Sequence, residues 1–468
     1  MKTFLAASFL LAASAAAAME VTVYNSNLGL VKDVRPFDLK TGVSEMKVED
    51  VAALIDPTSV HFRSLTAPDA VSVLEQDFRY DLVSQDKLLE RYLGREIELV
   101  RPVGRDGVKQ ETIKGVLLSN VGGLVLQSEG KILVNPPGSP VLPALPDGLL
   151  TKPTLVWKLD ARQGGVQQGE ISYLTAGLGW SADYVLVADK DDVKGDLTAW
   201  VTVTNNSGAT YKDAKLKLVA GDVHRAQAPV ARMRFAMARM DAAAAAPAMT
   251  EQPFFEYHMY TLARPTTLAD NSSKQVEMAS ATGVPIKKMY VYDGAAGLFW
   301  YGGDAGNWNP AYGLGENKKV AVLLELKNDK ASGLGIPLPK GRVRVYKKDN
   351  DGSLQFAGED SIDHTPKDET VRVKLGDAFD LVGERKRTDY SSDQSKHRFE
   401  ETFEIHVRNH KDAAADVTVV ERLYRWSGWK IVSASSKWTK KDAQTIEFPV
   451  TVPKDGEAVV TYTVRYAW

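Results

Sequence analysis

Carboxylates and an imidazole gather in one short stretch of the chain, between Gly358 and Thr365. Groups of this kind can bind a divalent cation through oxygen, and a carboxylate beside an imidazole can supply an acid/base pair. The alternative is turn chemistry, in which Asp side chains accept hydrogen bonds from nearby backbone amides. If the chain is an enzyme, we expect its catalytic residues to be Asp360, Asp363 and His364.

A second stretch, residues 299–313, alternates aromatic residues with glycines. Aromatic rings on a glycine-spaced loop can stack on sugar rings or anchor a partner protein. The alternative is a loop that folds its rings back onto the core, because large aromatic side chains are usually buried. The predicted binding residues are Phe299, Trp300, Tyr301, Trp308 and Tyr312.

Other suggestive spacings do not fit the structure that their chemistry needs. His406 and His410 have the spacing of a zinc-binding helix, but they lie in a strand-like stretch where four residues span about 13 Å. Residues 177–182 match G-x-G-x-x-A, yet an alternating strand follows instead of the helix that a dinucleotide fingerprint opens. We therefore predict no metal and no cofactor. The basic residues of 385–387 and 396–398 are expected on a solvated hairpin tip.

Composition excludes several classes of protein. The 468 residues include no cysteine, which rules out disulfides, thiolate zinc sites, iron–sulfur clusters and a cysteine nucleophile. The formal net charge is −2, so no overall basic field exists that would hold nucleic acid. With 44% hydrophobic and 25% charged residues, the composition is typical of folded globular chains.

The N-terminus has the pattern of a secretory signal peptide. Lys2 precedes an apolar run, Phe4 to Leu11, and small residues end in Ala16-Ala17-Ala18. This order predicts cleavage after about Ala18; the alternative is an alanine-rich helix that the mature chain keeps. The apolar stretch is shorter than the roughly 20 residues of a membrane-spanning helix. We expect an exported, periplasmic or extracellular protein with no membrane span in the mature chain.

Alternation of apolar and polar residues with period two dominates the chain after this segment and predicts a mostly β fold. We expect one or two immunoglobulin-like β-sandwich domains, preceded by a β region with a short helix and a small barrel of the SH3 or Sm kind. A helical stripe between Asp77 and Leu93 supplies the helix. The predicted boundaries are 1–18 signal peptide, 19–94 N-terminal β region with the helix, 95–135 small barrel, 136–154 proline-rich linker, 155–225 first part of the sandwich, 226–253 Ala/Met-rich insertion and 254–468 C-terminal sandwich region.

Several strings of residues resemble one family in their order and spacing. They are Tyr173-x6-Trp180-x3-Tyr184, Thr204-Asn-Asn-Ser-Gly208, Tyr260-Thr-Leu-x-Arg264-Pro265, Leu338-Pro-Lys-Gly-Arg-Val-Arg-Val-Tyr346, Phe356-Ala-Gly-Glu-Asp-Ser-Ile-Asp-His-Thr365 and Gly376-Asp-Ala-Phe-Asp380. From about Leu155 to Trp468 the chain is similar to the exported bacterial family called domain of unknown function 4139, whose members include mucoidy-inhibitor-A-like proteins. The resemblance implies export and brings no catalytic residues.

Three classes of function remain open at this stage. The leading hypothesis is an exported, soluble protein of the cell envelope with a non-enzymatic binding or structural role, whose partner is an envelope protein or a glycan and not a nucleic acid. The second is a hydrolase acting on envelope polymers through the Asp/His group. The third is an outer-membrane β-barrel, suggested by the alternating, aromatic C-terminus from Val460 to Trp468. The oligomeric state stays open.

Overall fold

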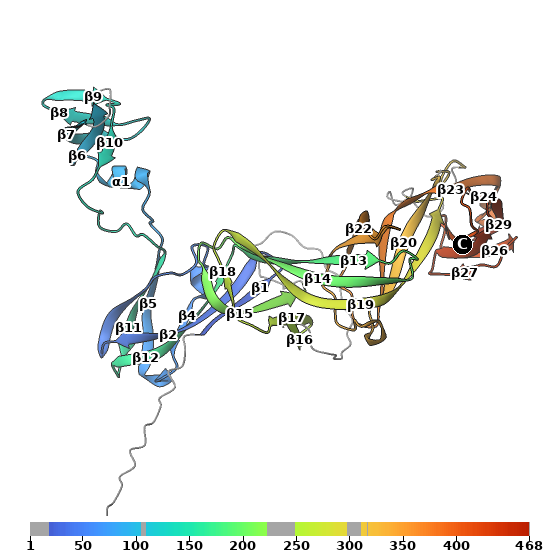
Figure 1. The fold of residues 1–468 in the computed structure, drawn as a ribbon, viewed down its shortest axis with the longest axis horizontal. Coiled ribbons are helices and arrows are strands. Elements are labelled where there is room, and N and C mark those ends of the chain that lie inside the picture. Colours follow the sequence, from blue (N-terminus) through green and yellow to red (C-terminus); the bar gives the residue numbers. More distant parts are fainter. Residues whose placement is uncertain (1–17, 104–108, 222–248, 297–309, 316, 468) are drawn as a thin grey trace, which may run out of the picture. The chain divides into compact units, whose positions relative to one another are not determined.

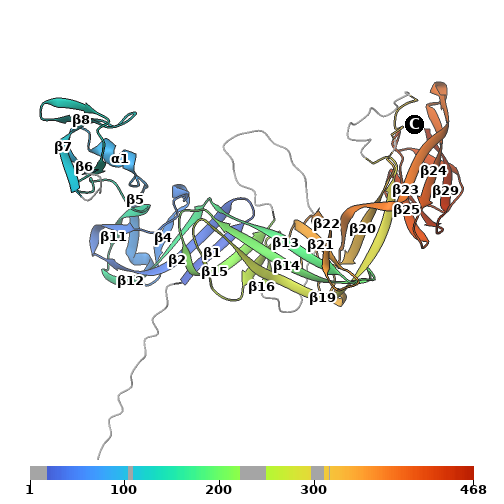
Figure 2. The ribbon, with the colours of Figure 1, turned by 45° about the horizontal axis from the view of Figure 1, so that its top comes forward.

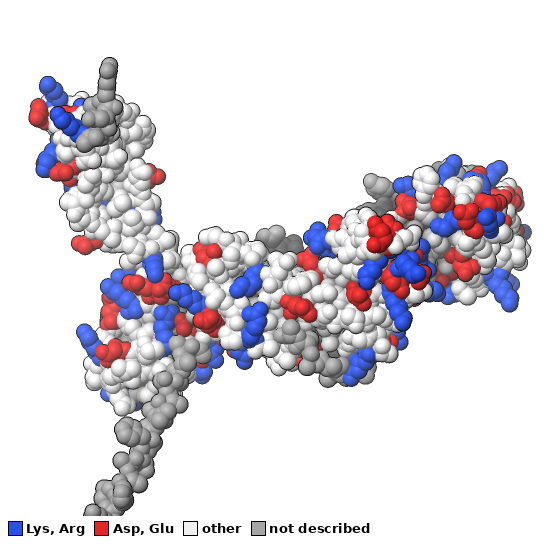
Figure 3. All heavy atoms as spheres, in the orientation of Figure 1, with Lys and Arg blue, Asp and Glu red and all other residues white. Residues whose placement is uncertain are grey.

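The protein is described by a computed structural model covering residues 18–103, 109–221, 249–296, 310–315 and 317–467. Over these residues the chain is mostly β, as the sequence predicts, with strands β1 to β29 and a single α-helix (Figure 1). The predicted signal peptide lies outside the described residues except for Ala18, and most of the predicted Ala/Met-rich insertion lies outside them as well. Basic and acidic side chains are interspersed on the face shown in Figure 3, in keeping with the near-zero net charge.

The chain divides into two compact units. Unit 1 comprises residues 1–179, 203–218 and 264–274, and unit 2 comprises residues 180–202, 219–263 and 275–468. The strands that lie wholly or mainly in unit 1 are β1 (Ala18–Tyr24), β2 (Leu28–Leu39), β3 (Gly42–Val48), β4 (His61–Ser64), β5 (Val71–Arg79), β6 (Glu96–Val103), β7 (Lys109–Ser119), β8 (Val125–Ser128), β9 (Lys131–Val134), β10 (Ser139–Val141), β11 (Thr154–Ala161), β12 (Gly165–Thr175), β15 (Tyr211–Ala220) and β18 (Thr266–Leu268).

Unit 1 contains three groups of paired strands. In the first, β15, β1, β2, β12 and β4 are neighbours in that order, and β18 also pairs with β15. The second has the order β3-β11-β5, and the third has the order β10-β6-β7-β8-β9. Leu155, Trp157 and Leu159 alternate along β11 and are buried. This is the period of two that a strand with one core face requires.

The helix of unit 1, α1 (Gln85–Arg91), is shorter than the predicted stripe. It begins after Ser84, whose hydroxyl accepts a hydrogen bond from the Lys87 amide and caps the first turn. Residues 77–79 instead extend β5 and pair with β11. Pairing with a neighbouring strand satisfies their backbone N–H and C=O groups as well as a helix would. Leu89 and Tyr92 at the end of the helix pack with Leu99 and Leu117 of the five-stranded group, so the helix covers part of that group's core.

The remaining strands that the structure describes lie wholly or mainly in unit 2. They are β13 (Leu178–Ala188), β14 (Lys194–Asn205), β16 (Met249–Phe254), β17 (Tyr257–Leu262), β19 (Ser272–Asp293), β20 (Lys319–Lys327), β21 (Gly341–Lys348), β22 (Leu354–Ile362), β23 (Thr370–Asp393), β24 (Arg398–Asn409), β25 (Ala415–Arg422), β26 (Trp429–Ala434), β27 (Thr439–Lys440), β28 (Thr445–Val452) and β29 (Glu457–Ala467). The order along the main sheet is β22-β21-β13-β14-β19-β20-β23-β24-β29-β26, while β25 pairs with β19 and β28, and β28 also pairs with β27.

Unit 2 has an apolar C-terminal core to which β23, β24 and β29 contribute. Figure 2 shows β23, β24 and β29 side by side, and their registers confirm antiparallel pairing. Phe403, Ile405 and Val407 alternate along β24 and are fully buried, the pattern of an antiparallel strand with one core face. They pack with residues of β25, β28 and β29 in one apolar cluster. This core positions the polar network described below.

Three buried asparagines lie where a strand ends and a loop begins. Asn205 ends β14, Asn409 ends β24, and Asn328 directly follows β20. The side-chain amide of each donates to backbone carbonyls of neighbouring loops: three for Asn205, three for Asn409 and two for Asn328. The side-chain oxygen of each accepts from a backbone amide further along its own loop. Each asparagine therefore replaces the hydrogen bonds that the strand ladder stops supplying.

His406 on the outer face of β24 predicts a pH dependence of stability. Its ring nitrogens lie 2.8 Å from Glu404 and 3.0 Å from Glu457. The hydrogen bond to Glu404, helped by Glu457 and opposed by partial burial, raises the pKa of His406 above its ordinary value of 6.5. The imidazolium form is therefore favoured in the folded chain, so its stabilising effect is fully present below pH 6.5 and is lost as the pH rises through the raised pKa.

We accordingly expect the urea midpoint of the wild type to fall as the pH is raised from about 6 to about 8, and His406→Asn to show a flatter profile. The control is His397→Asn, whose position is exposed on the turn after β23. Parallel profiles for the wild type and His406→Asn would contradict the assignment.

Candidate functional site

The predicted catalytic group lies at the end of β22 and in the turn that follows. The Asp360 carboxylate accepts hydrogen bonds from the backbone amides of Ser361 and Lys374, both at 2.8 Å. Nδ1 of His364 accepts from the Lys340 amide at 3.2 Å. The backbone carbonyl of Asp363 accepts from the Thr365 hydroxyl at 2.9 Å. Asp360 and His364 thus accept hydrogen bonds from backbone amides, including those of Lys374 on β23 and of Lys340.

A hollow of about 480 Å³ opens beside this turn, and Asp363 lines it together with Asp183 and Arg342. Asp360 and His364 are not among its lining residues, so the hollow does not bring the three predicted residues together. Within its lining, Arg342 forms an ion pair with Asp183 at 3.3 Å, and Arg344 nearby reaches the same carboxylate at 3.4 Å. Among the described residues, no group of three or more His, Asp or Glu side chains could hold a metal ion.

Of the predicted aromatic binding residues, only Tyr312 falls within the described part of the chain; Phe299, Trp300, Tyr301 and Trp308 lie outside it. The Tyr312 ring is half-buried and meets the Tyr424 ring edge to face at a centroid distance of 5.6 Å. The Arg425 guanidinium lies 5.8 Å from the Tyr312 ring, within the range of a cation–π contact. Tyr312 therefore sits at the rim of a polar network inside the C-terminal core.

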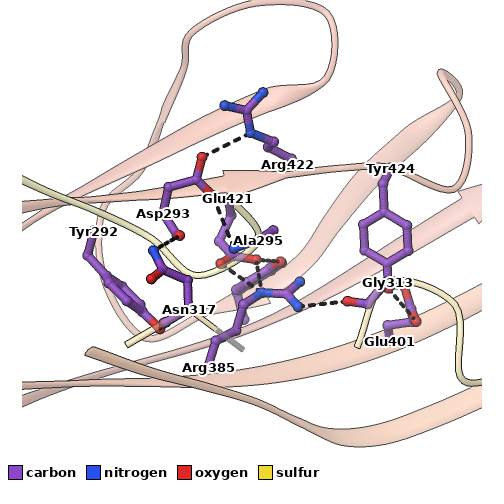
Figure 4. A network of polar contacts seen from close by, with 11 residues as sticks. Tyr292, Asp293, Ala295, Gly313, Asn317, Arg385, Glu401, Glu421, Arg422 and Tyr424 are labelled. Carbon is purple, nitrogen blue, oxygen red and sulfur yellow. Dashed lines mark hydrogen bonds and ion pairs between the residues drawn. The ribbon is translucent and has the colours of Figure 1, made fainter. Parts of the chain in front are cut away.

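The first half of this network joins β23, β25 and β29. Figure 4 shows its Arg385–Glu421 ion pair. Nε of Arg385 donates to both carboxylate oxygens of Glu421 at 3.0 Å, and the Tyr462 hydroxyl donates to the same carboxylate at 2.5 Å. The side chains of Arg385 and Glu421 are 1% and 0% exposed. The Arg385 guanidinium also lies 3.9 Å from the centroid of the Phe403 ring. Nη2 of Arg385 is buried without a hydrogen-bond partner among the described residues, so the ion pair is desolvated but its donors are not all satisfied.

The second half centres on Glu401 of β24. Its carboxylate accepts from Arg387 at 2.8 Å, from Arg425 at 3.0 Å and from the Tyr424 hydroxyl at 3.0 Å. Glu401 is fully buried, and the Arg425 side chain is too. Three buried or nearly buried arginines thus share two carboxylates, so the core carries an excess of positive charge that tyrosine hydroxyls and aromatic faces help to stabilise.

Burial controls the ionisation of this cluster. It raises the pKa of Glu421 above the usual glutamate range, against the pull of Arg385 and the Tyr462 hydrogen bond. Burial also raises the pKa of Tyr462 and Tyr424, and the neighbouring carboxylates add to the effect, so both stay neutral hydroxyl donors. Burial alone would lower the pKa of Arg385. The negative charge of Glu421 outweighs this effect and raises the pKa, so the guanidinium stays charged.

The network reaches Tyr312 and Gly313 through their backbone carbonyls. Nη1 of Arg385 donates to the Gly313 carbonyl at 3.1 Å, and Arg425 donates to the Tyr312 carbonyl at 3.3 Å. Gly313 has a φ of +78°, and a Cβ there would overlap the Tyr424 ring, so only glycine fits. The side-chain amide of Asn317 donates to the Asp293 carbonyl at 2.9 Å. The end of the predicted glycine-aromatic stretch is therefore fixed to the buried arginines.

The prediction that residues 385–387 lie on a solvated hairpin tip is wrong for Arg385 and Arg387, whose side chains are 1% and 9% exposed. Only Lys386 between them is exposed, because a strand directs alternate side chains to opposite faces. The alternation of side chains along the strand could have predicted their burial. Arg385 falls in step with Leu381 and Gly383, which face the core.

The fold and the network together define a β-rich protein whose C-terminal core is built around buried ion pairs. A family model described as "Domain of unknown function (DUF4139)" matches residues 170–468, more than half of the chain. The chain belongs to this family. No curated protein matches the chain. Within the described ranges, no helix is long and apolar enough to cross a membrane.

Proposed function

We propose that the chain is an exported protein of the cell envelope that binds a protein or a glycan and catalyses no reaction. The observation that carries the proposal is the attachment of Tyr312 and Gly313 to the buried arginines. Fixing the end of a glycine-aromatic stretch lowers the entropy that its rings lose on binding. The use of Asp360 and His364 as acceptors for backbone amides also supports a non-enzymatic role.

The finer architecture is part of the same proposal. We propose that the C-terminal core is an immunoglobulin-like sandwich, because residues of β24 and β29 pack against residues of β25 and β28 in one cluster. We propose that strands β6 to β10 form a small barrel of the SH3 or Sm kind, since five short antiparallel strands surround one apolar core. An experimental structure with a different strand order in either part would contradict these assignments.

The binding proposal predicts the outcome of a double substitution in the aromatic stretch. Trp300→Ala with Trp308→Ala should lower retention of the purified full chain on washed envelope material by about tenfold, because aromatic anchors carry most of the energy of such contacts. The control is Trp438→Ala, an exposed tryptophan of the C-terminal core region. Both variants should keep the wild-type urea midpoint. Equal retention of the double variant and the wild type would refute the proposal.

Export is tested separately, so that the two parts of the proposal can fail independently. Leu10→Arg with Leu11→Arg interrupts the apolar run and should leave the chain unprocessed inside the cell. The wild type should instead be recovered outside the cytoplasm with its N-terminus near Met19. A wild-type chain that keeps residues 1–18 would contradict the export proposal.

A further inference from the structure

The five-stranded group of unit 1 ends on one side in β9. Among the described residues this strand pairs only with β8, so its other edge carries no partner strand. Ile132 and Val134 lie on one face of β9, and they are 65% and 71% exposed. An apolar strand at the edge of a sheet is a template on which another strand can pair. β9 therefore has the properties of an assembly surface.

The turn before β9 fixes which backbone groups point to the free edge. Residues 129–130 form a two-residue turn with φ of +49° and +74°, as a type I′ hairpin requires. Lys131 flanks this turn and pairs with the residue on its other side, so the backbone groups of Lys131 point towards β8. These groups alternate along a strand, so those of Leu133 also point towards β8. The N–H and C=O groups of Ile132 and Val134 point to the free edge.

The opposite edge of the group is protected against further pairing. Its end strand is β10, which contains Pro140. Proline in an edge strand turns its nitrogen outward and has no hydrogen to donate, so a strand added there would lack a hydrogen bond. Sheet edges are protected in this way or by charged side chains. β9 is described throughout and has one charged residue, Lys131 beside the turn, so the edge at Ile132 and Val134 lacks both devices.

The free edge of β9 is complementary to itself. In an antiparallel pair related by a two-fold axis, Ile132 of one copy can lie opposite Val134 of the other, with Leu133 at the axis. Two residues whose backbone groups face each other then exchange N–H and C=O hydrogen bonds, and the axis repeats the exchange. The same register places exposed apolar side chains against each other and Lys131 opposite Asn135, so no like charges meet.

We propose that the chain forms a symmetric dimer in which β9 pairs with β9 of a second copy and joins two five-stranded groups into one continuous sheet. Pro140 at the opposite edge keeps the assembly closed, because a strand added to β10 would lack a hydrogen bond. The paired edge is short, so the interface belongs to the small, weakly bound class and the dimer forms at high protein concentration. The dimer does not depend on the proposed binding function.

Charge variants of the purified full chain test the pairing. Ile132→Lys with Val134→Lys places like charges opposite each other in this register and should weaken dimerisation at least about tenfold. Ile132→Lys with Val134→Glu removes the same apolar side chains but places opposite charges across the axis, so it should dimerise at least about tenfold more tightly than the first variant. Sedimentation velocity at about 10 µM and about 300 µM measures the dissociation constants. Both variants should keep the wild-type urea midpoint, because the two positions are exposed.

A control at the opposite edge separates the symmetric dimer from a head-to-tail assembly. Val141→Lys adds a charge at an exposed position of β10 and should leave the dissociation constant of the wild type unchanged. Loss of association in this variant would assign β9 to the β10 edge of the next copy and would overturn the symmetric pairing.

Hydrogen exchange tests the backbone contacts directly. When the concentration rises from about 10 µM to about 300 µM, the amides of Ile132 and Val134 should become protected, because they point to the free edge. The amide of Leu133, which points towards β8, should be equally protected at both concentrations. A wild type that stays monomeric at the higher concentration would overturn the proposal, as would equal dissociation constants for the two charge variants.

Discussion

Replacing Glu421 with alanine is expected to lower the free energy of unfolding by about 3–5 kcal/mol, the usual effect of removing one partner from a buried ion pair. The substitution leaves Arg385 charged in a core that excludes water, because its side chain is only 1% exposed. It also removes the acceptor of the Tyr462 hydroxyl. Urea unfolding of the full chain, followed by tryptophan fluorescence, measures the loss.

A matched control comes from the neighbouring residue on β23. Glu384 pairs with Arg408 at 3.0 Å, but both side chains are well exposed, so Glu384→Ala should cost less than about 1 kcal/mol. The double variant Arg385→Met with Glu421→Leu removes both charges and should recover most of the stability lost by Glu421→Ala. If Glu421→Ala and Glu384→Ala have similar effects, the pair is not desolvated as described.

The same network shows what the sequence could predict. The period of two in β24 identifies Phe403, Ile405 and Val407 as one face, and the structure buries all three. Glu401 has the same parity and is buried with them, although charge alone predicts a solvated side chain. A charged residue in step with core residues was therefore the available signal. The sequence does not show which opposite charges pair with Glu401, because Arg387 lies on β23 and Arg425 lies in the segment between β25 and β26.

The predicted catalytic group shows what the spacing of residues in the sequence could not predict. Local spacing brought Asp360, Asp363 and His364 together in the sequence, but a strand and its turn direct neighbouring side chains apart. The Asp360 carboxylate reaches the amide of Lys374 on β23, and His364 reaches the amide of Lys340. These acceptor roles depend on how β22 packs on β23 and on the approach of the Lys340 segment. Residue types within eight positions could not reveal them.

The second large loss of stability is expected when a buried asparagine is replaced. Asn205 is 1% exposed, and its side-chain amide donates to the carbonyls of Ala209, Leu268 and Ala269 at 2.8 to 3.1 Å. Its side-chain oxygen accepts from the amide and the hydroxyl of Ser207. Asn205→Ala should lower the free energy of unfolding by about 3 kcal/mol, because each buried polar group left without a partner costs about 1–3 kcal/mol.

The adjacent Asn206 provides the control, because it has the same residue type but an exposed side chain. Asn206→Ala should change the free energy of unfolding by no more than about 0.5 kcal/mol. Asn205→Asp keeps the shape and the acceptor but loses the donors, so it should resemble Asn205→Ala more than the wild type. Asn409→Ala should repeat the effect in the C-terminal core, where the same donors reach the carbonyls of Ala413, Val452 and Pro453. Equal effects at Asn205 and Asn206 would show that the loops are held by other contacts, and the asparagines would then be incidental to the strand ends that they occupy.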